Sequence, residues 1–217
     1  RRAQYREIVS HLGGLLGEPD FQLCEQFHHV LWCGDLNYRC VDHSGKTLPA
    51  DEACLMLEQG QCRRLFEVHD QLNQERAAQA VFHNFHEPSP FPDFWPTYKK
   101  YENREPLDYG DPSWVRQCYR TKYKEPFYKG GRVKERTPGW CDRVLYHSLP
   151  DVLDLLLPEP LSTELAVITG ARSHAASADP PVVSATLDNY RSINDGEGMS
   201  VSDHSPVYAT FVMRIER

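Results

Sequence analysis

Residues 32–39 read WCGDLNYR, and this stretch decides how the chain is best interpreted. The compact apolar run before it, residues 27–33, predicts a buried strand that ends at a glycine. Asp35 and Asn37 follow two positions apart, and side chains so spaced in an extended segment point to the same side. A carboxylate there can activate a water molecule, and an amide can donate a hydrogen bond to a phosphate oxygen. The alternative is an Asx turn, in which both side chains satisfy backbone groups.

A second strand is expected over residues 140–146, which read WCDRVLY. Asp142 and Arg143 are neighbours in it, so their side chains face opposite sides of the strand. A buried aspartate needs a partner. That partner is either a histidine, which would give Asp142 a role in a site, or a cation in a structural salt bridge between strands.

A third stretch of interest, SDHSP, covers residues 202–206 and precedes an alternating apolar pattern. The alternation predicts a last strand over residues 204–215. His204, at the start of that strand, would be accessible and would titrate near neutral pH. Asp203 beside it could orient a metal ion or its water molecules. Both residues could instead be merely structural or exposed.

The remaining pattern favours a mixed fold of helices and strands. Apolar spacing and helix-start signals predict helices over residues 1–16, 51–57, 61–68 and 73–82. Loops are expected at residues 86–96, a long irregular excursion at 100–138 and a flexible insertion at 170–181. Polar residues just past strand ends are where layered α/β proteins tend to carry their chemistry.

Charge and cysteine content narrow the function classes. The net charge is −7, which argues against general affinity for nucleic acid. Residues 99–143 nevertheless carry twelve Lys or Arg against seven Asp or Glu, so this segment is either a local anion site or a solvated loop. The seven cysteines include no CxxC pair, which disfavours zinc and disulfides and favours a reducing compartment. No apolar run is long enough to predict a membrane span.

WCGDLNYR, RTPGWCDRVL (136–145) and SDHSPV (202–207) resemble, in order, three signature motifs of the inositol polyphosphate 5-phosphatases. Shorter stretches are similar to further family segments: RRAQY (1–5), HDQLN (69–73) and FWPTYK (94–99). The resemblance covers residues 1–217 as one partial catalytic domain, with insertions near 101–131 and 158–198. It implies the four-layer α/β/β/α sandwich of the endonuclease/exonuclease/phosphatase superfamily.

The resemblance also implies a role for each matching catalytic residue. Asp35 would orient or activate the attacking water, and Asn37 would hold the scissile phosphate. His204 would bind that phosphate, oriented by Asp142. Asp203 would lie near the shell of a Mg²⁺ ion, which would neutralise charge on the phosphate oxygens. Four further residues match positions that bind the phosphate next to the scissile one on the inositol ring. They are Tyr98, Lys99, Lys134 and Arg136.

Parts of the family pattern are missing from these 217 residues. The early motifs, with the glutamate that is the family's main metal ligand, are expected upstream of Arg1. Without them, metal binding is expected to be weak, one of the two sheets would lack strands, and an apolar edge would be exposed.

The function implied is Mg²⁺-dependent hydrolysis of the 5-phosphate of phosphoinositide lipids or soluble inositol phosphates, including phosphatidylinositol dephosphorylation. The expected location is cytoplasmic, with a peripheral position at membranes as one option, and no nucleic-acid partner. One alternative is a nuclease or another phosphodiesterase of the same superfamily, which Tyr98, Lys99 and the WCDR motif disfavour. The other is a non-catalytic module that binds phosphoinositides or a protein.

Overall fold

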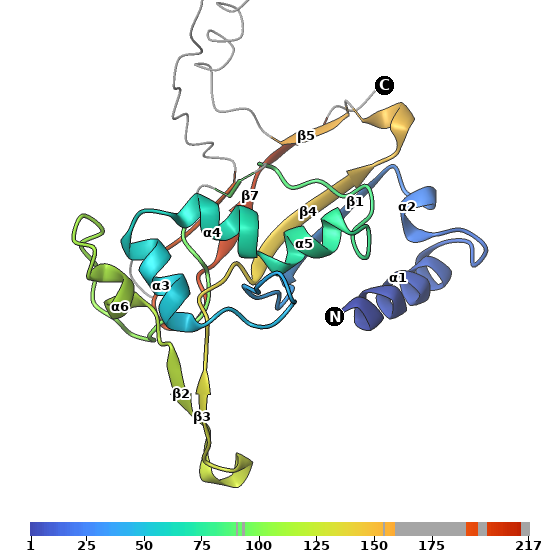
Figure 1. The fold of residues 1–217 in the computed structure, drawn as a ribbon. Helices are drawn as coiled ribbons and strands as arrows, with labels where there is room; N and C mark the ends of the chain where they lie inside the picture. The colour runs from blue at the N-terminus through green and yellow to red at the C-terminus, as the bar shows by residue number, and fades with distance from the viewer. Residues whose placement is uncertain (90, 93, 154, 159–189, 195–198, 214–217) are drawn as a thin grey trace, which may run out of the picture.

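Two long antiparallel strands form the centre of the molecule (Figure 1). The computed structural model describes all residues except 90, 93, 154, 159–189, 195–198 and 214–217. Strand β1 is His29–Asp35 and strand β4 is Asp142–Ser148. Their register pairs His29 with Ser148 at one end and Asp35 with Asp142 at the other. The two predicted strands are therefore confirmed, and their pairing brings two carboxylate residues to the same strand end.

The predicted last strand over 204–215 is wrong in extent. The chain forms β7 (Val207–Ala209) and β8 (Phe211–Met213), which are separated at Thr210. Strand β7 pairs with β6 (Tyr190–Ser192), and β8 pairs with β5 (Leu156–Pro158), both in antiparallel fashion. The alternating pattern was continuous, but a change of pairing partner interrupts the ladder.

The helices predicted over 1–16, 51–57 and 61–68 are confirmed to within a residue at each end, whereas those at 23–26 and 114–118 were not expected. The described helices are α1 (Arg2–Leu16), α2 (Leu23–Gln26), α3 (Ala50–Glu58), α4 (Cys62–His69), α5 (Gln71–Ala77) and α6 (Trp114–Cys118). The predicted helix over 73–82 ends early, because Gln79 and Phe82 adopt left-handed backbone conformations with φ of 53° and 51°. That turn directs Phe82 into the core, where it is buried. Within the described residues, no helix combines the length and apolarity needed to cross a bilayer.

The segment predicted to be an irregular excursion, 100–138, is partly ordered instead. It contains α6, the hairpin of β2 (Lys122–Lys124) and β3 (Val133–Glu135), and a 3₁₀ turn, Phe127–Lys129, at the hairpin tip. Such short elements span too few residues to show a period in the sequence. The predicted loop at 86–96 holds for its described residues, and a further 3₁₀ turn covers Pro150–Val152. The predicted insertion at 170–181 lies outside the described residues.

Two apolar clusters join the helices to the strands. In the larger one, side chains of α3, α4 and α6 pack with Trp140 and Tyr190 and reach Val144 of β4. In the smaller one, Phe82 and Leu145 pack with Trp32 of β1. Tyr5 anchors α1 there, with its ring centroid 4.6 Å from that of Phe82. The second edge of β1 has no paired strand in the described part of the chain.

Arg143 ties β4 to the surrounding elements through a buried ion cluster. Its guanidinium donates to Asp70 Oδ1 at 3.1 Å and to the two carboxylate oxygens of Glu87 at 2.5 and 2.7 Å. Tyr190 adds a hydrogen bond to Glu87 at 3.0 Å. The structural salt bridge considered for this strand therefore involves Arg143, which leaves Asp142 on the opposite side.

Candidate active site

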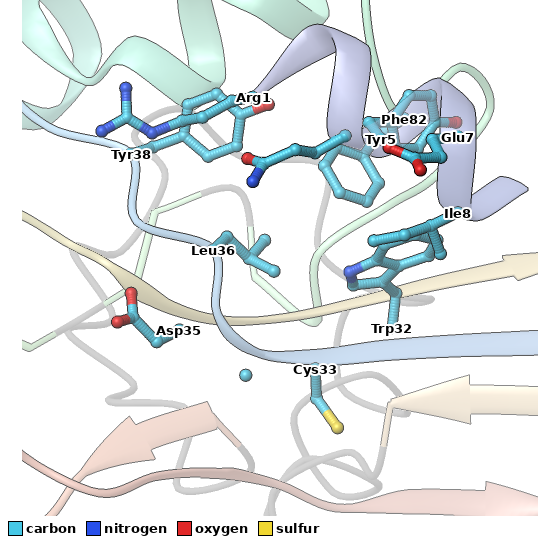
Figure 2. Close-up of a pocket in the computed structure, with 12 residues that line it drawn as sticks. Arg1, Tyr5, Glu7, Ile8, Trp32, Cys33, Asp35, Leu36, Tyr38 and Phe82 are labelled. Carbon is cyan, nitrogen blue, oxygen red and sulfur yellow. The ribbon is translucent and has the colours of Figure 1, made fainter.

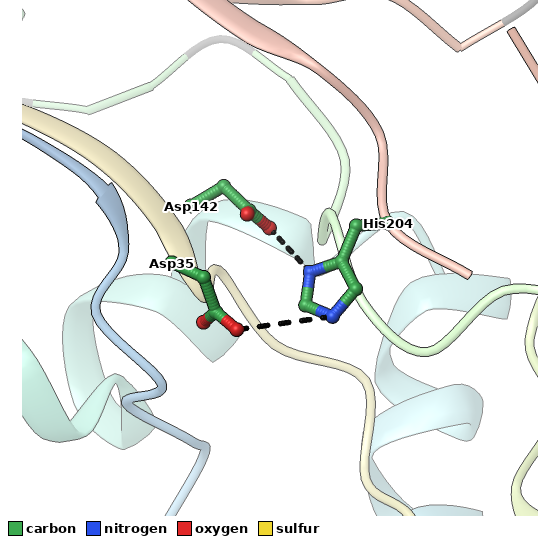
Figure 3. Close-up of side chains that lie close together, drawn as sticks. All are labelled: Asp35, Asp142 and His204. Carbon is green, nitrogen blue, oxygen red and sulfur yellow. Dashed lines mark hydrogen bonds and ion pairs between the residues drawn. The ribbon is translucent and has the colours of Figure 1, made fainter. Parts of the chain in front are cut away.

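His204 lies between the two carboxylates at the end of β1 and β4 (Figure 3). Its Nδ1 is 2.9 Å from Asp142 Oδ2, and its Nε2 is 4.0 Å from Asp35 Oδ2. Burial alone would lower the pKa of His204. The hydrogen bond to Asp142 and the charges of Asp142, Asp35 and Asp203 outweigh burial, so the pKa is raised. The structure thus brings together Asp35, Asp142 and His204, all of which the sequence indicated.

A buried threonine holds Asp142 in place. Thr97 Oγ1 donates to Asp142 Oδ2 at 2.6 Å, and Thr97 is fully buried. The carbonyl of Thr97 accepts from the Ser205 backbone N–H at 2.9 Å, which fixes the loop that carries His204. Sequence reasoning missed this positioning residue, although it lies within the quoted FWPTYK stretch.

The backbone after β1 is not extended. The prediction that Asp35 and Asn37 point to the same side of an extended segment is therefore wrong. Asn37 has φ of 59°, and its N–H donates to Asp35 Oδ1 at 2.8 Å, which is the Asx arrangement considered as the alternative. Only one carboxylate oxygen of Asp35 is used in this way. The other, Oδ2, faces His204.

Arg39 was not expected in the site, yet it connects Asn37 to the aromatic wall. Its guanidinium donates to Asn37 Oδ1 at 2.8 Å and lies 3.8 Å from the ring centroid of Tyr98. The Tyr98 ring in turn lies 4.7 Å from the His204 ring. The only signal for Arg39 in the sequence is its place in the WCGDLNYR motif.

The side of Asp35 that faces α1 opens into a pocket of about 490 Å³ (Figure 2). Arg1 and Tyr38 line it beside Asp35, with the Arg1 guanidinium 5.5 Å from the Tyr38 ring centroid. Arg1 also donates to Asn37 Oδ1 at 3.4 Å. The lining combines the guanidinium of Arg1 with the carboxylates of Asp35 and Glu7 and with apolar side chains such as Ile8 and Phe82, so its charge does not favour an anion.

The four candidate phosphate-gripping residues separate into two pairs. Tyr98 and Lys99 lie beside His204, and the Lys99 ammonium forms an ion pair with Asp203. Lys134 instead pairs with Glu125 at 2.7 Å, and Arg136 donates to the Glu135 carbonyl at 3.2 Å. These contacts of Lys134 and Arg136 lie within the hairpin.

The described residues offer a sparse site for a divalent cation. Ligand atoms of Asp35, Asp142 and His204 lie within 4.8 Å of one another, but Asp142 Oδ2 already accepts from Thr97 and interacts with His204. Asp203 is engaged by Lys99, which helps to lower the Asp203 pKa against the opposing effect of burial. Asp35 Oδ2, 4.0 Å from His204 Nε2, is one carboxylate oxygen available to an ion. Mg²⁺ is often held by one or two carboxylates with water and substrate phosphate, so these residues fit a weakly held ion.

Taken together, the fold and the site define a class: a mixed α/β protein with an Asp–His–Asp group at the end of paired strands. A family model described as "Endonuclease/Exonuclease/phosphatase family 2" matches residues 1–210, and the chain belongs to this family. The mixed α/β class expected from the sequence is confirmed, and so is the resemblance to the 5-phosphatases.

Relatives with assigned names are 5-phosphatases. Phosphatidylinositol 3,4,5-trisphosphate 5-phosphatase 1 of Xenopus laevis is 30% identical over 97% of this chain, which spans 15% of that relative. The Homo sapiens protein of the same name is also 30% identical over 97% of this chain, which spans 13% of it. Type I inositol polyphosphate 5-phosphatase 5 of Arabidopsis thaliana is 34% identical over 67% of the chain and 24% of its own length.

A solved structure gives the same family. The inositol polyphosphate 5-phosphatase domain of SPsynaptojanin, in complex with inositol (1,4)-bisphosphate and calcium, matches with a TM-score of 0.55 and 26% identity. The match covers 97% of this chain and 40% of that one.

Proposed function

We propose that this chain supplies catalytic residues for hydrolysis of the 5-phosphate of phosphoinositides or inositol polyphosphates. The observation that carries the proposal is the position of His204, with Nδ1 held by Asp142 and Nε2 directed toward the open oxygen of Asp35. The names of the relatives support the substrate class. We also propose that the protein acts in the cytoplasm at a membrane surface. The cysteines of the described residues are free, which is compatible with a reducing compartment.

In the proposed reaction, Asp35 accepts a proton and His204 contacts a charged phosphate oxygen. Asp35 takes a proton from the water whose oxygen attacks phosphorus, while the P–O bond to the inositol ring breaks and the leaving ring oxygen takes up a proton from solvent. His204, oriented through Nδ1, directs Nε2 at a phosphate oxygen and offsets its developing charge when protonated. Asn37 keeps its amide oxygen on Arg39, which leaves its NH₂ group to donate to the phosphate. A bound Mg²⁺, near Asp35 and Asp203, would add neutralisation of the phosphate charge.

Phosphate release tests the proposal directly. The 217-residue chain is assayed on a short-chain phosphatidylinositol bisphosphate with Mg²⁺ and with chelator, beside the SPsynaptojanin domain as positive control. Release that requires Mg²⁺ supports the proposal. Lipid binding without release, from a folded chain, favours the second candidate, a non-catalytic phosphoinositide-binding module. The ion pair between Asp203 and Lys99 is the observation that favours this second candidate.

Replacing Lys99 should change selectivity between substrates. We expect Lys99→Met to weaken use of a substrate bearing a 4-phosphate about tenfold to a hundredfold more than one without it, because a charged hydrogen bond to that phosphate is lost. The measurement is the ratio of kcat/KM for the two substrates. Loss of the Lys99–Asp203 pair affects both substrates alike, so the ratio isolates the 4-phosphate. Lys46→Met, at an exposed turn, is the control, and equal losses on both substrates would contradict the assignment.

A further inference from the structure

The β2–β3 hairpin projects from the body of the molecule and ends in two exposed aromatic residues (Figure 1). Phe127 is 97% exposed and Tyr128 is 82% exposed, the highest values for large hydrophobic side chains among the described residues. Isolated apolar side chains are common on protein surfaces. Two adjacent aromatic rings at the end of a projecting element are different, because neither ring packs against the body.

The hairpin tip, residues 125–132, has a defined backbone. The Glu125 N–H donates to the Arg132 carbonyl at 2.9 Å, and the Lys129 N–H donates to the Pro126 carbonyl at 2.9 Å. The turn is closed by Gly130, whose φ of 100° is readily accessible only to glycine. Because these backbone groups already have hydrogen-bond partners within the tip, fewer of them would lose a partner when the tip leaves bulk water.

Positive charge lies along the hairpin that carries the two rings, although the whole chain is acidic. The cations of the hairpin and its base are Lys122, Lys124, Lys129, Arg132, Lys134 and Arg136. Its two carboxylates are engaged locally, because Glu125 pairs with Lys134 and Glu135 accepts from the Ala50 N–H at 2.5 Å. The hairpin therefore presents an excess of positive charge around an apolar end.

We propose that the hairpin tip is a membrane-contact element that inserts Phe127 and Tyr128 among the headgroups of an anionic bilayer. Aromatic residues concentrate at membrane interfaces, and basic side chains are attracted to the negative surface potential of anionic lipids. A projecting tip suits a deformable surface better than it suits a partner that needs a broad, complementary interface. The net charge of −7 disfavours nucleic acid as the occupant.

The base of the hairpin is joined to the candidate active site. The Arg120 N–H donates to the Lys99 carbonyl at 2.9 Å, and the Lys99 ammonium lies 5.1 Å from the ring centroid of Tyr123 on β2. Four extended residues from Tyr123 to Phe127 span about 13 Å. An inserted tip would thus hold Lys99 near the bilayer surface, where a lipid headgroup is presented. Only this last consequence rests on the proposed function.

Vesicle co-sedimentation of the 217-residue chain tests membrane binding without requiring catalysis. The vesicles are phosphatidylcholine alone and phosphatidylcholine mixed with phosphatidylserine, both without phosphoinositide. We expect binding to the anionic vesicles, and we expect Phe127→Ser with Tyr128→Ser to lower the partition coefficient about tenfold or more. Phe21→Ser, which removes an exposed aromatic ring outside the hairpin, is the matched control and should retain binding.

Three outcomes would overturn the inference: no binding to anionic vesicles, equal binding by wild type and the double variant, or an equal loss in the Phe21→Ser control. If the wild-type chain binds vesicles but releases no phosphate from any substrate, the proposed function fails while the membrane contact stands. The two failures are therefore distinguishable.

Discussion

Asp35→Asn should reduce phosphate release by about a hundred- to ten-thousand-fold, the usual contribution of a general base. The substitution removes the charge that takes the proton from water but keeps the size of the side chain. Its amide oxygen can still accept the Asn37 N–H, as Asp35 Oδ1 does at 2.8 Å, so the turn after β1 should persist. The loss should fall mainly on kcat, because proton transfer occurs in the transition state rather than in substrate binding.

The control for this experiment is Asp42→Asn. Asp42 makes a similar turn, accepting the Ser44 N–H at 2.8 Å, but it is not part of the Asp35–Asp142–His204 group. It should therefore keep the activity of the wild type, and circular dichroism should show that both variants remain folded. Substantial turnover by folded Asp35→Asn would remove Asp35 from the role of base.

Arg143→Met should destabilise the fold by about 3–5 kcal/mol, the range found when one partner of a buried ion pair is removed. Methionine nearly fills the space but leaves the carboxylates of Asp70 and Glu87 without their cation. Asp70 is fully buried, and burial already raises its pKa despite the opposing effect of Arg143. The measurement is the free energy of unfolding in urea, with activity recorded only under conditions where the variant is folded.

Arg63→Met separates a general effect of arginine loss from the effect of burial. Arg63 pairs with Glu67 one helical turn away, and both side chains are largely exposed. Such a pair contributes about 0–1 kcal/mol. Similar losses for the two variants would show that the ion cluster around Arg143 is not a main support of β4.

Local pattern was enough to find several elements and to single out Asp35, Asp142 and His204 as candidates. The spacing of Tyr5, Ile8 and Leu12 predicted the first helix, which the structure confirms as α1. The adjacency of Asp142 and Arg143 predicted side chains on opposite sides of a strand, and the structure shows one in the site and the other in the core. These features depend on the period of a single segment, and that period is written in the sequence.

Local pattern failed where the backbone turns or changes partner. The helix predicted to reach Phe82 ends at Ala77, and the Phe82 ring packs in the core instead. Thr210 interrupts a predicted strand because β7 and β8 pair with different strands. Asn37 was expected in extended backbone but lies in a turn. In each case a contact distant in the sequence outweighs the local preference.

By itself, the sequence determined the chemical inventory and its family: the carboxylates, the histidine and the basic segment lie in motifs that need no structure to be seen. The tertiary structure decided which side chains touch: it forms the Asp142–His204 contact that the family resemblance implied, and it pairs Lys99 with Asp203, which the sequence did not indicate. Asp142 and His204 are 62 residues apart, and Lys99 and Asp203 are 104 apart. Periodicity determines which face of a segment is apolar, but burial, strand register and the pairing of charges determine which faces meet.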